Sequence, residues 1–254
     1  MVKVGIIGGS GLDNPQILKK AGEIEVETPY GGPTSILTCG VIEGVEVAII
    51  ARHGKNHSIF PSKVNFRANI WALKELGCTH VLATTAVGSL REEIKPGHLV
   101  FPNQFIDHTK KRELTFFDED VVVHTPMAEP FCSNLIELCS LSAEQKKIPF
   151  HRNKTVITIE GPRFSTKAES RMFRSWMADV INMSTVPEVN LAREKKMHYA
   201  AIAMSTDYDC WREGEESVTW ETIARMMQNN ADNVIKLLLD VIPKIREYND
   251  VCIN

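Results

Sequence analysis

The stretch 61–88, PSKVNFRANIWALKELGCTHVLATTAVG, decides the fold class because a helix and a buried strand follow each other directly in it. Apolar residues recur at helical spacing over 61–77, between a proline in the first turn and a closing glycine, which predicts an amphipathic helix. The short apolar run at 81–86 predicts a buried strand that ends in a Val-Gly-Ser turn.

The same alternation of strands and helices extends outward on both sides of this stretch. On the N-terminal side, 2–7 is typical of a strand that ends in a glycine-rich loop, and 35–51 is typical of a β-hairpin. On the C-terminal side we expect strands at 99–106, 155–159, 180–183 and 199–206, and helices at 128–147, 165–176, 186–196 and 218–248. The pattern predicts an α/β fold with a mixed or parallel central sheet flanked by helices, in a single domain over 1–254.

The composition of the chain argues against nucleic acids and membranes as binding partners. A formal net charge of −3 lacks the basic surplus that nucleic-acid binding requires. No apolar run approaches the roughly 20 residues that span a membrane, and the short apolar N-terminus suits a first strand better than a signal peptide. The six cysteines form no CxxC pair, so we expect free thiols in a cytoplasmic protein.

Every loop that follows an expected strand contains chemically useful groups. In open α/β sheets, ligands bind outside the carboxyl ends of the strands. The segments at these ends hold glycines, hydroxyls, histidines, acids and an arginine: 8–11, 52–54, 84–86, 160–164, 183–185 and 206–209. We therefore expect a small-molecule site at this edge of the sheet.

The groups suited to bind an anion come from the first half of the chain. The glycines and Ser10 at 8–11 can offer N–H groups and a hydroxyl, although the segment is neither a P-loop nor a complete GxGxxG fingerprint. Arg52 matches phosphate oxygens with its planar fork; the alternative is a structural arginine paired with a surface carboxylate. His53 and His57 lack an evident third ligand, so we expect no metal site there.

Asp207 and Asp209 end a very apolar strand and are spaced to face the same side. Two carboxylates on one face repel each other, so one takes a raised pKa and can donate while the other accepts. The alternative is a solvated turn. Glu160 and Glu188 are further possible acids, but each is next to a proline and can instead bridge parts of the structure.

Seven segments together resemble the methylthioadenosine phosphorylase branch of the trimeric purine nucleoside phosphorylases. They follow the family's order through most of the chain: GIIGGSGL at 5–12, ARHGKNH at 51–57, the long stretch 61–97, MAEPFC at 127–132, ITIEGPRFSTKAES at 157–170, ADVINMSTVPEVNLA at 178–192 and AIAMSTDYDCW at 201–211. The resemblance implies phosphorolysis of 5′-methylthioadenosine to adenine and 5-methylthioribose 1-phosphate. It implies a homotrimer or a hexamer, and phosphate as co-substrate without any cofactor or metal.

The resemblance also implies roles for single residues. The implied phosphate ligands are Ser10, Arg52, His53, Thr85, Ala86 and Ser184. The implied nucleoside contacts are Met183 at the ribose, Phe164, Ser165 and Thr206 near the purine, Asp207 at N7, Asp209 at the 6-amino group, and Trp220 with a neighbouring subunit's His124 near the 5′ substituent. Asp207 would be the catalytic acid.

Two departures from the family pattern affect the periphery of the site. Residues 109–123, the least regular and most charged stretch, look shorter than in the animal enzymes, and we expect a loop or lid there. Trp220 stands where the animal enzymes have smaller aliphatic residues, so the sequence does not fix the width of the methylthio pocket.

Three alternative functions stay open from the sequence. They are a broader purine nucleoside phosphorylase acting on adenosine or 6-oxopurines, a dinucleotide-dependent oxidoreductase, and a nucleoside-binding protein without catalysis.

Overall fold

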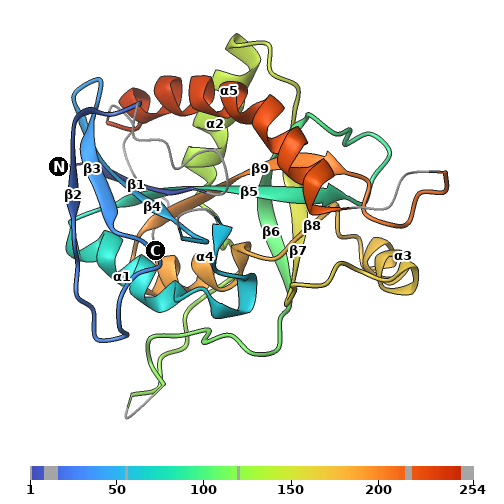
Figure 1. Cartoon of the computed structure of the whole chain (residues 1–254), viewed down its shortest axis with the longest axis horizontal. Helices are drawn as coiled ribbons and strands as arrows, with labels where there is room; N and C mark the ends of the chain where they lie inside the picture. The colour runs from blue at the N-terminus through green and yellow to red at the C-terminus, as the bar shows by residue number, and fades with distance from the viewer. Residues whose placement is uncertain (1, 9–16, 55–56, 119–120, 215–218, 247–254) are drawn as a thin grey trace.

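The computed structural model describes residues 2–8, 17–54, 57–118, 121–214 and 219–246 (Figure 1). One nine-stranded sheet organises them, in the order β2-β3-β4-β1-β5-β8-β7-β6-β9. The strands are β1 (Lys3–Gly8), β2 (Lys19–Ile24), β3 (Leu37–Ile42), β4 (Val45–Ala51), β5 (His80–Ser89), β6 (Leu99–His108), β7 (Phe150–Ile159), β8 (Val180–Asn182) and β9 (His198–Asp207).

The N-terminal half of the sheet is built around β1, which pairs in parallel with both β4 and β5. Its apolar residues Val4, Ile6 and Ile7 are fully buried, as expected for a strand covered on both faces. The expected hairpin at 35–51 is confirmed as the antiparallel pair β3–β4. Strand β2 was not expected, because its sequence KKAGEI is exposed throughout and shows no apolar alternation.

The other half of the sheet closes on itself. β5 pairs with β9 along its length and with β8 at its end, while β6 and β7 complete the circuit between β9 and β8. The expected Val-Gly-Ser turn after β5 is wrong. Gly88 and Ser89 pair with Ile181 and Val180 of β8, so ladder hydrogen bonds hold this segment extended.

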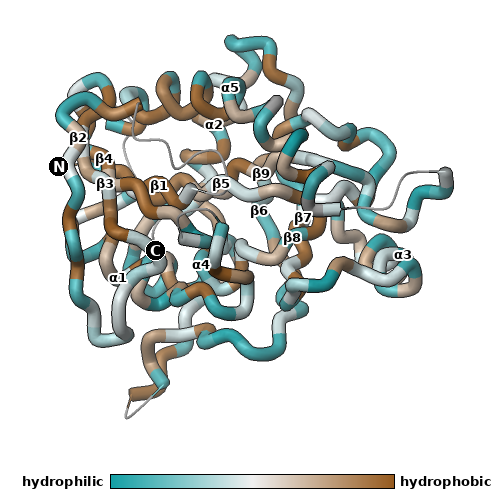
Figure 2. Tube along the Cα trace, viewed as in Figure 1, coloured by the Kyte–Doolittle hydropathy of each residue, from teal (hydrophilic) through white to brown (hydrophobic). Residues whose placement is uncertain are grey.

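Helices cover both faces of the sheet (Figure 1). α5 (Trp220–Ile245) packs against α2 (Ser133–Gln145) on one face, and α1 (Phe66–Glu75) packs against α4 (Thr185–Glu194) on the other. α3 (Lys167–Ser175) lies beside the ends of β7 and β8. Figure 2 shows the hydrophobic residues gathered along the central strands and on the sheet-facing side of α5.

Two helices begin later than the sequence predicts. The expected helix at 61–77 divides into a 3₁₀ turn, Pro61–Lys63, and α1, which begins after Asn65 because the Asn65 side chain accepts the N–H of Ala68. The expected helix at 128–147 begins only at Ser133, because the residue before Pro130 is biased away from helical geometry.

In the described part of the chain, no helix has the length and apolarity needed to cross a lipid bilayer.

Over 109–118 the irregular segment after β6 is hydrogen-bonded to the residue that follows β7 and to the end of α4. The N–H groups of Lys110 and Lys111 donate to Glu160, and Thr115 and Phe116 donate to Glu194. A loop or a lid was expected here. The segment forms no helix or strand over 109–118 and is a loop that these two carboxylates anchor.

Candidate active site

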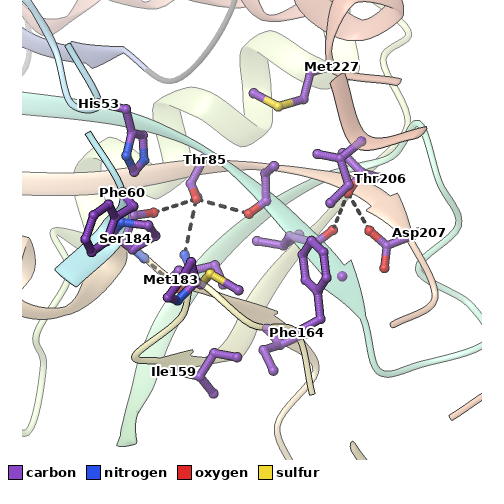
Figure 3. A pocket seen from close by; sticks show the side chains of 18 of the residues that line it. His53, Phe60, Thr85, Ile159, Phe164, Met183, Ser184, Thr206, Asp207 and Met227 are labelled. Carbon is purple, nitrogen blue, oxygen red and sulfur yellow. Dashed lines mark hydrogen bonds between the residues drawn. The ribbon is translucent and has the colours of Figure 1, made fainter. Parts of the chain in front are cut away.

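A cavity of about 380 Å³ opens at the carboxyl ends of β4, β5, β7, β8 and β9. Ile223 and Met227 of α5 close one side of it with apolar side chains. The cavity brings together most of the residues predicted from the sequence: Arg52, His53, Thr85, Ala86, Phe164, Ser165, Met183, Ser184, Thr206, Asp207 and Asp209. Figure 3 shows two ends, with His53, Thr85 and Ser184 at one and Phe164, Thr206 and Asp207 at the other.

Three predicted residues do not line this cavity in the described structure. Ser10 lies outside the described residues, and Trp220 begins α5 but its side chain is not described. His124 is exposed on the irregular segment after β6 and is not among the lining residues. Its predicted place is in a neighbouring subunit's site, which a single chain does not test.

Hydroxyl groups from β5 and from the turn after β8 meet at the first end. Thr85 Oγ1 and Ser184 Oγ are 2.8 Å apart, and Asn182 Nδ2 lies 3.3 Å from Thr85 Oγ1. Both hydroxyls belong to nearly fully buried residues. Asn182 was missed by sequence reasoning, although its position directly before Met183 and Ser184 could have indicated it.

Arg52 lies at the same end with only 1% of its surface exposed. Its Nε and Nη2 donate to the two carboxylate oxygens of Glu188, and its Nη1 donates to the carbonyl of Thr84 at 2.7 Å. These bonds use three of the five N–H donors of a guanidinium, and within the described residues two remain for a ligand. The partner is therefore a buried carboxylate and not the surface one considered from the sequence, and Glu188 acts as a structural bridge.

His53 is a neutral group beside Arg52. Burial, together with the positive charge of Arg52, lowers the pKa of His53 to about 3. Its Nδ1 is 2.8 Å from the carbonyl oxygen of Ile59, which can only accept, so Nδ1 carries the proton and Nε2 is an acceptor. Among the described residues, no group of three or more His, Cys, Asp or Glu side chains could hold a metal ion.

The two aspartates stand at the second end of the cavity. Asp207 is the last residue of β9, and Asp209 follows in a left-handed turn with φ of 51°. The Asp209 N–H donates to Asp207 Oδ1 at 2.7 Å, so both side chains line the cavity because the chain turns, not because it stays extended. The expected placement is right, but its expected geometric reason is wrong.

The pKa of Asp207 is raised to about 6. Burial is the main cause, and the negative charge of Asp209 adds less to the shift than hydrogen bonds to Thr206 and Asp209 remove from it. Burial also raises the pKa of Asp209. The sequence predicted a raised pKa from mutual repulsion, whereas the structure gives burial as the larger effect.

The walls between the two ends are mostly apolar. Phe164, 39% exposed, lies at the end that holds Asp207, and Met183 lies between the two ends (Figure 3). Sequence reasoning missed several apolar lining residues, which come from loops and strands far apart in the chain: Phe60, Pro61, Val87, Ile159, Ile181, Ile223 and Met227. Such a cavity can hold a flat heterocycle and a sugar between an anion-binding end and a carboxyl pair.

Comparison with known proteins agrees with this geometry. The family model described as "Phosphorylase superfamily" matches residues 3–243. An S-methyl-5′-thioadenosine phosphorylase of Danio rerio is 54% identical and is aligned over 100% of this chain and 92% of its own length.

Solved structures extend this likeness to three dimensions. The methylthioadenosine phosphorylase of Schistosoma mansoni, in complex with adenine, superposes with a TM-score of 0.94 at 42% identity, covering 98% of this chain and 93% of that chain. A mutant of the Schistosoma mansoni adenosine/methylthioadenosine phosphorylase in complex with methylthioadenosine gives a TM-score of 0.93 at 41% identity, covering 98% and 93% of the two chains. The chain therefore belongs to the phosphorylase superfamily and, within it, to the S-methyl-5′-thioadenosine phosphorylase family.

Proposed function

We propose that this chain catalyses the reversible phosphorolysis of 5′-methylthioadenosine to adenine and 5-methylthioribose 1-phosphate. The observation that carries the proposal is one cavity with anion donors at one end and the Asp207–Asp209 pair at the other. The complexes of the Schistosoma mansoni enzymes with adenine and methylthioadenosine support the same substrate class.

Asp207 is the proposed catalytic acid. Its pKa of about 6 keeps a usable fraction protonated near neutrality, so its carboxyl can donate to N7 of the purine. As the bond between C1′ and N9 breaks, the electron pair goes to the purine, and this hydrogen bond stabilises the negative charge that develops there. Phosphate oxygen then forms the new bond to C1′, on the face opposite to the leaving base.

Asp209 is proposed to select the base. An ionised Asp209 accepts a hydrogen bond from the 6-amino group of adenine, whereas a 6-oxopurine places a carbonyl oxygen against the carboxylate. Two acceptors that face each other leave buried polar groups unpaired, and such mismatches can cost several powers of ten in selectivity. This distinguishes the proposal from a 6-oxopurine phosphorylase on the same scaffold.

The phosphate end is proposed to work with directed donors. Two N–H groups of Arg52 and the hydroxyl of Ser184 donate to phosphate oxygens, with Thr85, Ala86 and Ser10 completing the contact. His53 Nε2, which is unprotonated, accepts a hydrogen bond from the hydroxyl of a monoprotonated phosphate. Neither bond change alters an oxidation state, so the reaction needs no redox cofactor, and we propose that it uses no metal.

The 5′ substituent is proposed to lie against the apolar side chains of Ile223 and Met227. An apolar pocket discriminates between methylthio and hydroxyl groups only by about 10²-fold or less. We therefore expect adenosine to be accepted as a slower substrate. Trp220 and Met183 are proposed to border the 5′ and ribose positions, with Phe164, Ser165 and Thr206 around the purine.

We further propose a homotrimer, with a hexamer as the alternative, in which His124 reaches a neighbouring subunit's cavity. Val121 and Val122, at 60% and 79% exposed, stand beside His124 and would be covered in such an assembly. The proposed location is the cytoplasm, which is supported by the absence of disulfide bonds among the described cysteines. There the reaction would serve methionine and purine salvage.

A substrate panel tests this function. Purified protein is assayed with excess phosphate and 5′-methylthioadenosine, adenosine or inosine, and the released base is quantified by chromatography. We expect adenine release to be fastest from methylthioadenosine, slower from adenosine, and hypoxanthine release to be negligible. Preferred cleavage of inosine would contradict the roles of both aspartates, and binding of adenine nucleosides without any turnover would favour the non-catalytic alternative.

A further inference from the structure

The side chain of Asn182 is the centre of a buried hydrogen-bond network behind the anion-binding end. It stands at the end of β8, in register with Thr158 of β7, and only 5% of its surface is exposed. Its Oδ1 accepts from the Thr158 hydroxyl at 2.8 Å and from the Ser184 N–H at 3.4 Å. Its Nδ2 faces two hydroxyl oxygens, those of Thr185 at 2.6 Å and Thr85 at 3.3 Å.

These partners fix the orientation of the amide. A backbone N–H can only donate, so the end of Asn182 that faces Ser184 N must be the oxygen. The other end is then the NH₂ group, which has two hydrogens and no acceptor capacity. Thr85 Oγ1 and Thr185 Oγ1 therefore each accept one amide hydrogen.

The orientation of the Thr85 hydroxyl group in turn determines the orientation of the Ser184 hydroxyl group. Because Thr85 Oγ1 accepts from the amide, its own hydrogen points away from Asn182, toward Ser184 Oγ at 2.8 Å or the Ala86 carbonyl at 3.1 Å. When Thr85 donates to Ser184, the hydrogen of Ser184 in turn points away from Thr85. Both residues line the cavity, so an anion there meets the hydroxyl hydrogen of Ser184 and not its lone pairs.

From this network we infer that Asn182 is a positioning residue that, by fixing the hydroxyl of Thr85, sets the hydroxyl of Ser184 as a hydrogen-bond donor for phosphate. The inference rests on the proposed function, because it assigns phosphate to this end of the cavity. Thr158 holds the amide from behind; it is fully buried and does not line the cavity. Asn182 thus affects the anion through the direction of its neighbours' hydroxyl groups.

Asn182→Asp reverses the direction of the hydrogen bonds to Thr85 and Thr185, while the side chain keeps nearly the same shape. A carboxylate only accepts, so the hydrogens of Thr85 and Thr185 turn toward it. The Thr85 oxygen then accepts from Ser184, and the lone pairs of Ser184 face the phosphate. We expect the KM for phosphate to rise at least about tenfold, since hydrogen bonds to a charged ligand contribute at least this factor, while the KM for methylthioadenosine stays within about threefold. Phosphate alone should also raise the Tm of the variant less than that of the wild type.

Asn69→Asp is the matched control for burying a carboxylate. Asn69 is fully buried and its Oδ1 accepts from Thr34, but its Nδ2 has no hydrogen-bond partner among the described residues. The substitution therefore removes no donor in use. We expect the phosphate KM of this variant to equal that of the wild type.

A double-mutant cycle separates direction from charge repulsion. In a Thr85→Val background, the hydroxyl that links Asn182 to Ser184 is absent. Asn182→Asp should then raise the phosphate KM by less than about threefold. If Asn182→Asp multiplies the KM by the same factor in both backgrounds, its charge acts directly on phosphate and the inference is overturned.

Thr158→Val provides a second route if Asn182→Asp does not fold. It removes the hydroxyl that holds Asn182 Oδ1, and we expect a rise of about threefold or more in the phosphate KM alone, as for the loss of one buried hydrogen bond. Unchanged phosphate KM values in both variants would overturn the inference while wild-type turnover stands. Absence of phosphate-dependent adenine release by the wild type would instead overturn the proposed function.

Discussion

Glu188 places both carboxylate oxygens against the guanidinium of Arg52, and the two side chains are buried to 0% and 1% exposure. The Tyr199 hydroxyl donates to Glu188 Oε2 at 2.9 Å, so the carboxylate is held from both sides. The positive charge of Arg52 is thus balanced before any ligand arrives. In its proposed role, Arg52 would offer phosphate two oriented N–H groups and not an uncompensated positive charge.

Glu188→Gln should destabilise the protein strongly. Removing one partner of a buried ion pair leaves an uncompensated charge and costs about 3–5 kcal/mol of unfolding free energy. Phosphate supplies the missing negative charge, so it should raise the Tm of the variant more than that of the wild type. The measurement is urea and thermal unfolding with and without phosphate.

The matched control is Glu137→Gln, because Glu137 pairs with Arg152 at a solvent-exposed site. Exposed pairs contribute about 0–1 kcal/mol, so this variant should unfold close to the wild type. Equal unfolding of the two variants, or the same effect of phosphate on Glu188→Gln and wild type, would contradict the compensation of the Arg52 charge by Glu188.

Asp207→Asn should change how stability depends on pH. The pKa of Asp207 in the folded state is about 6, above its ordinary value, so ionisation is less favourable in the folded than in the unfolded chain. The stabilisation that this gives is complete below the ordinary pKa of about 4 and is lost as the pH rises through the folded value. The Tm of Asp207→Asn relative to wild type should therefore increase from acidic to neutral pH, and a constant difference would contradict the raised pKa.

Asp209→Asn should relax the choice of base. The amide can donate a hydrogen bond to the 6-oxo group, which an ionised carboxylate cannot do, so the ratio of kcat/KM for adenosine over inosine should fall by about tenfold or more. The steady-state ratio is measured with phosphate in excess, and Asp240→Asn, a substitution on α5 outside the cavity, is the control. An unchanged ratio would show that base selection does not depend on Asp209.

Gly161→Ala should disturb the position of Met183. Gly161 has φ of 70°, and a Cβ atom there would overlap Met183 Sδ, which must shift within the cavity. Gly214→Ala is the control, because Gly214 has φ of 81° but open space where the alanine Cβ would lie. Both variants bear the left-handed strain of roughly 1–2 kcal/mol, yet only Gly161→Ala should raise the KM for methylthioadenosine. Equal KM values for the two variants would remove Met183 from the nucleoside site.

The parts of the fold that depend on local sequence were predictable. The β3–β4 hairpin, the strand that ends at Asp207 and the long amphipathic α5 all follow from apolar periodicity and turn residues. The closure of β5 on β8 was not predictable, because it depends on pairing between Gly88 and Ile181, which lie far apart in the chain. Strand β2 was missed because its exposed sequence contains no apolar alternation.

The candidate site shows the same division. Arg52, Thr85, Ser184 and the two aspartates were identified because each directly ends or follows an apolar strand. The partner of Arg52 and the cause of the raised pKa of Asp207 were not predictable. The partner of Arg52 is 136 residues away, and the pKa of Asp207 is raised mainly by burial. Asn182 was missed because its importance depends on four neighbours that only the folded sheet brings together.

The central claim is that phosphate, and not water, attacks the sugar in this cavity. The direct measurement is adenine release from 5′-methylthioadenosine as phosphate is varied from none to excess, with the sugar product identified by ³¹P NMR. We expect release that depends on phosphate, with one equivalent of a sugar 1-phosphate formed for each adenine. Release without phosphate, yielding free methylthioribose, would make the protein a hydrolase and contradict the roles given to Arg52, Thr85 and Ser184.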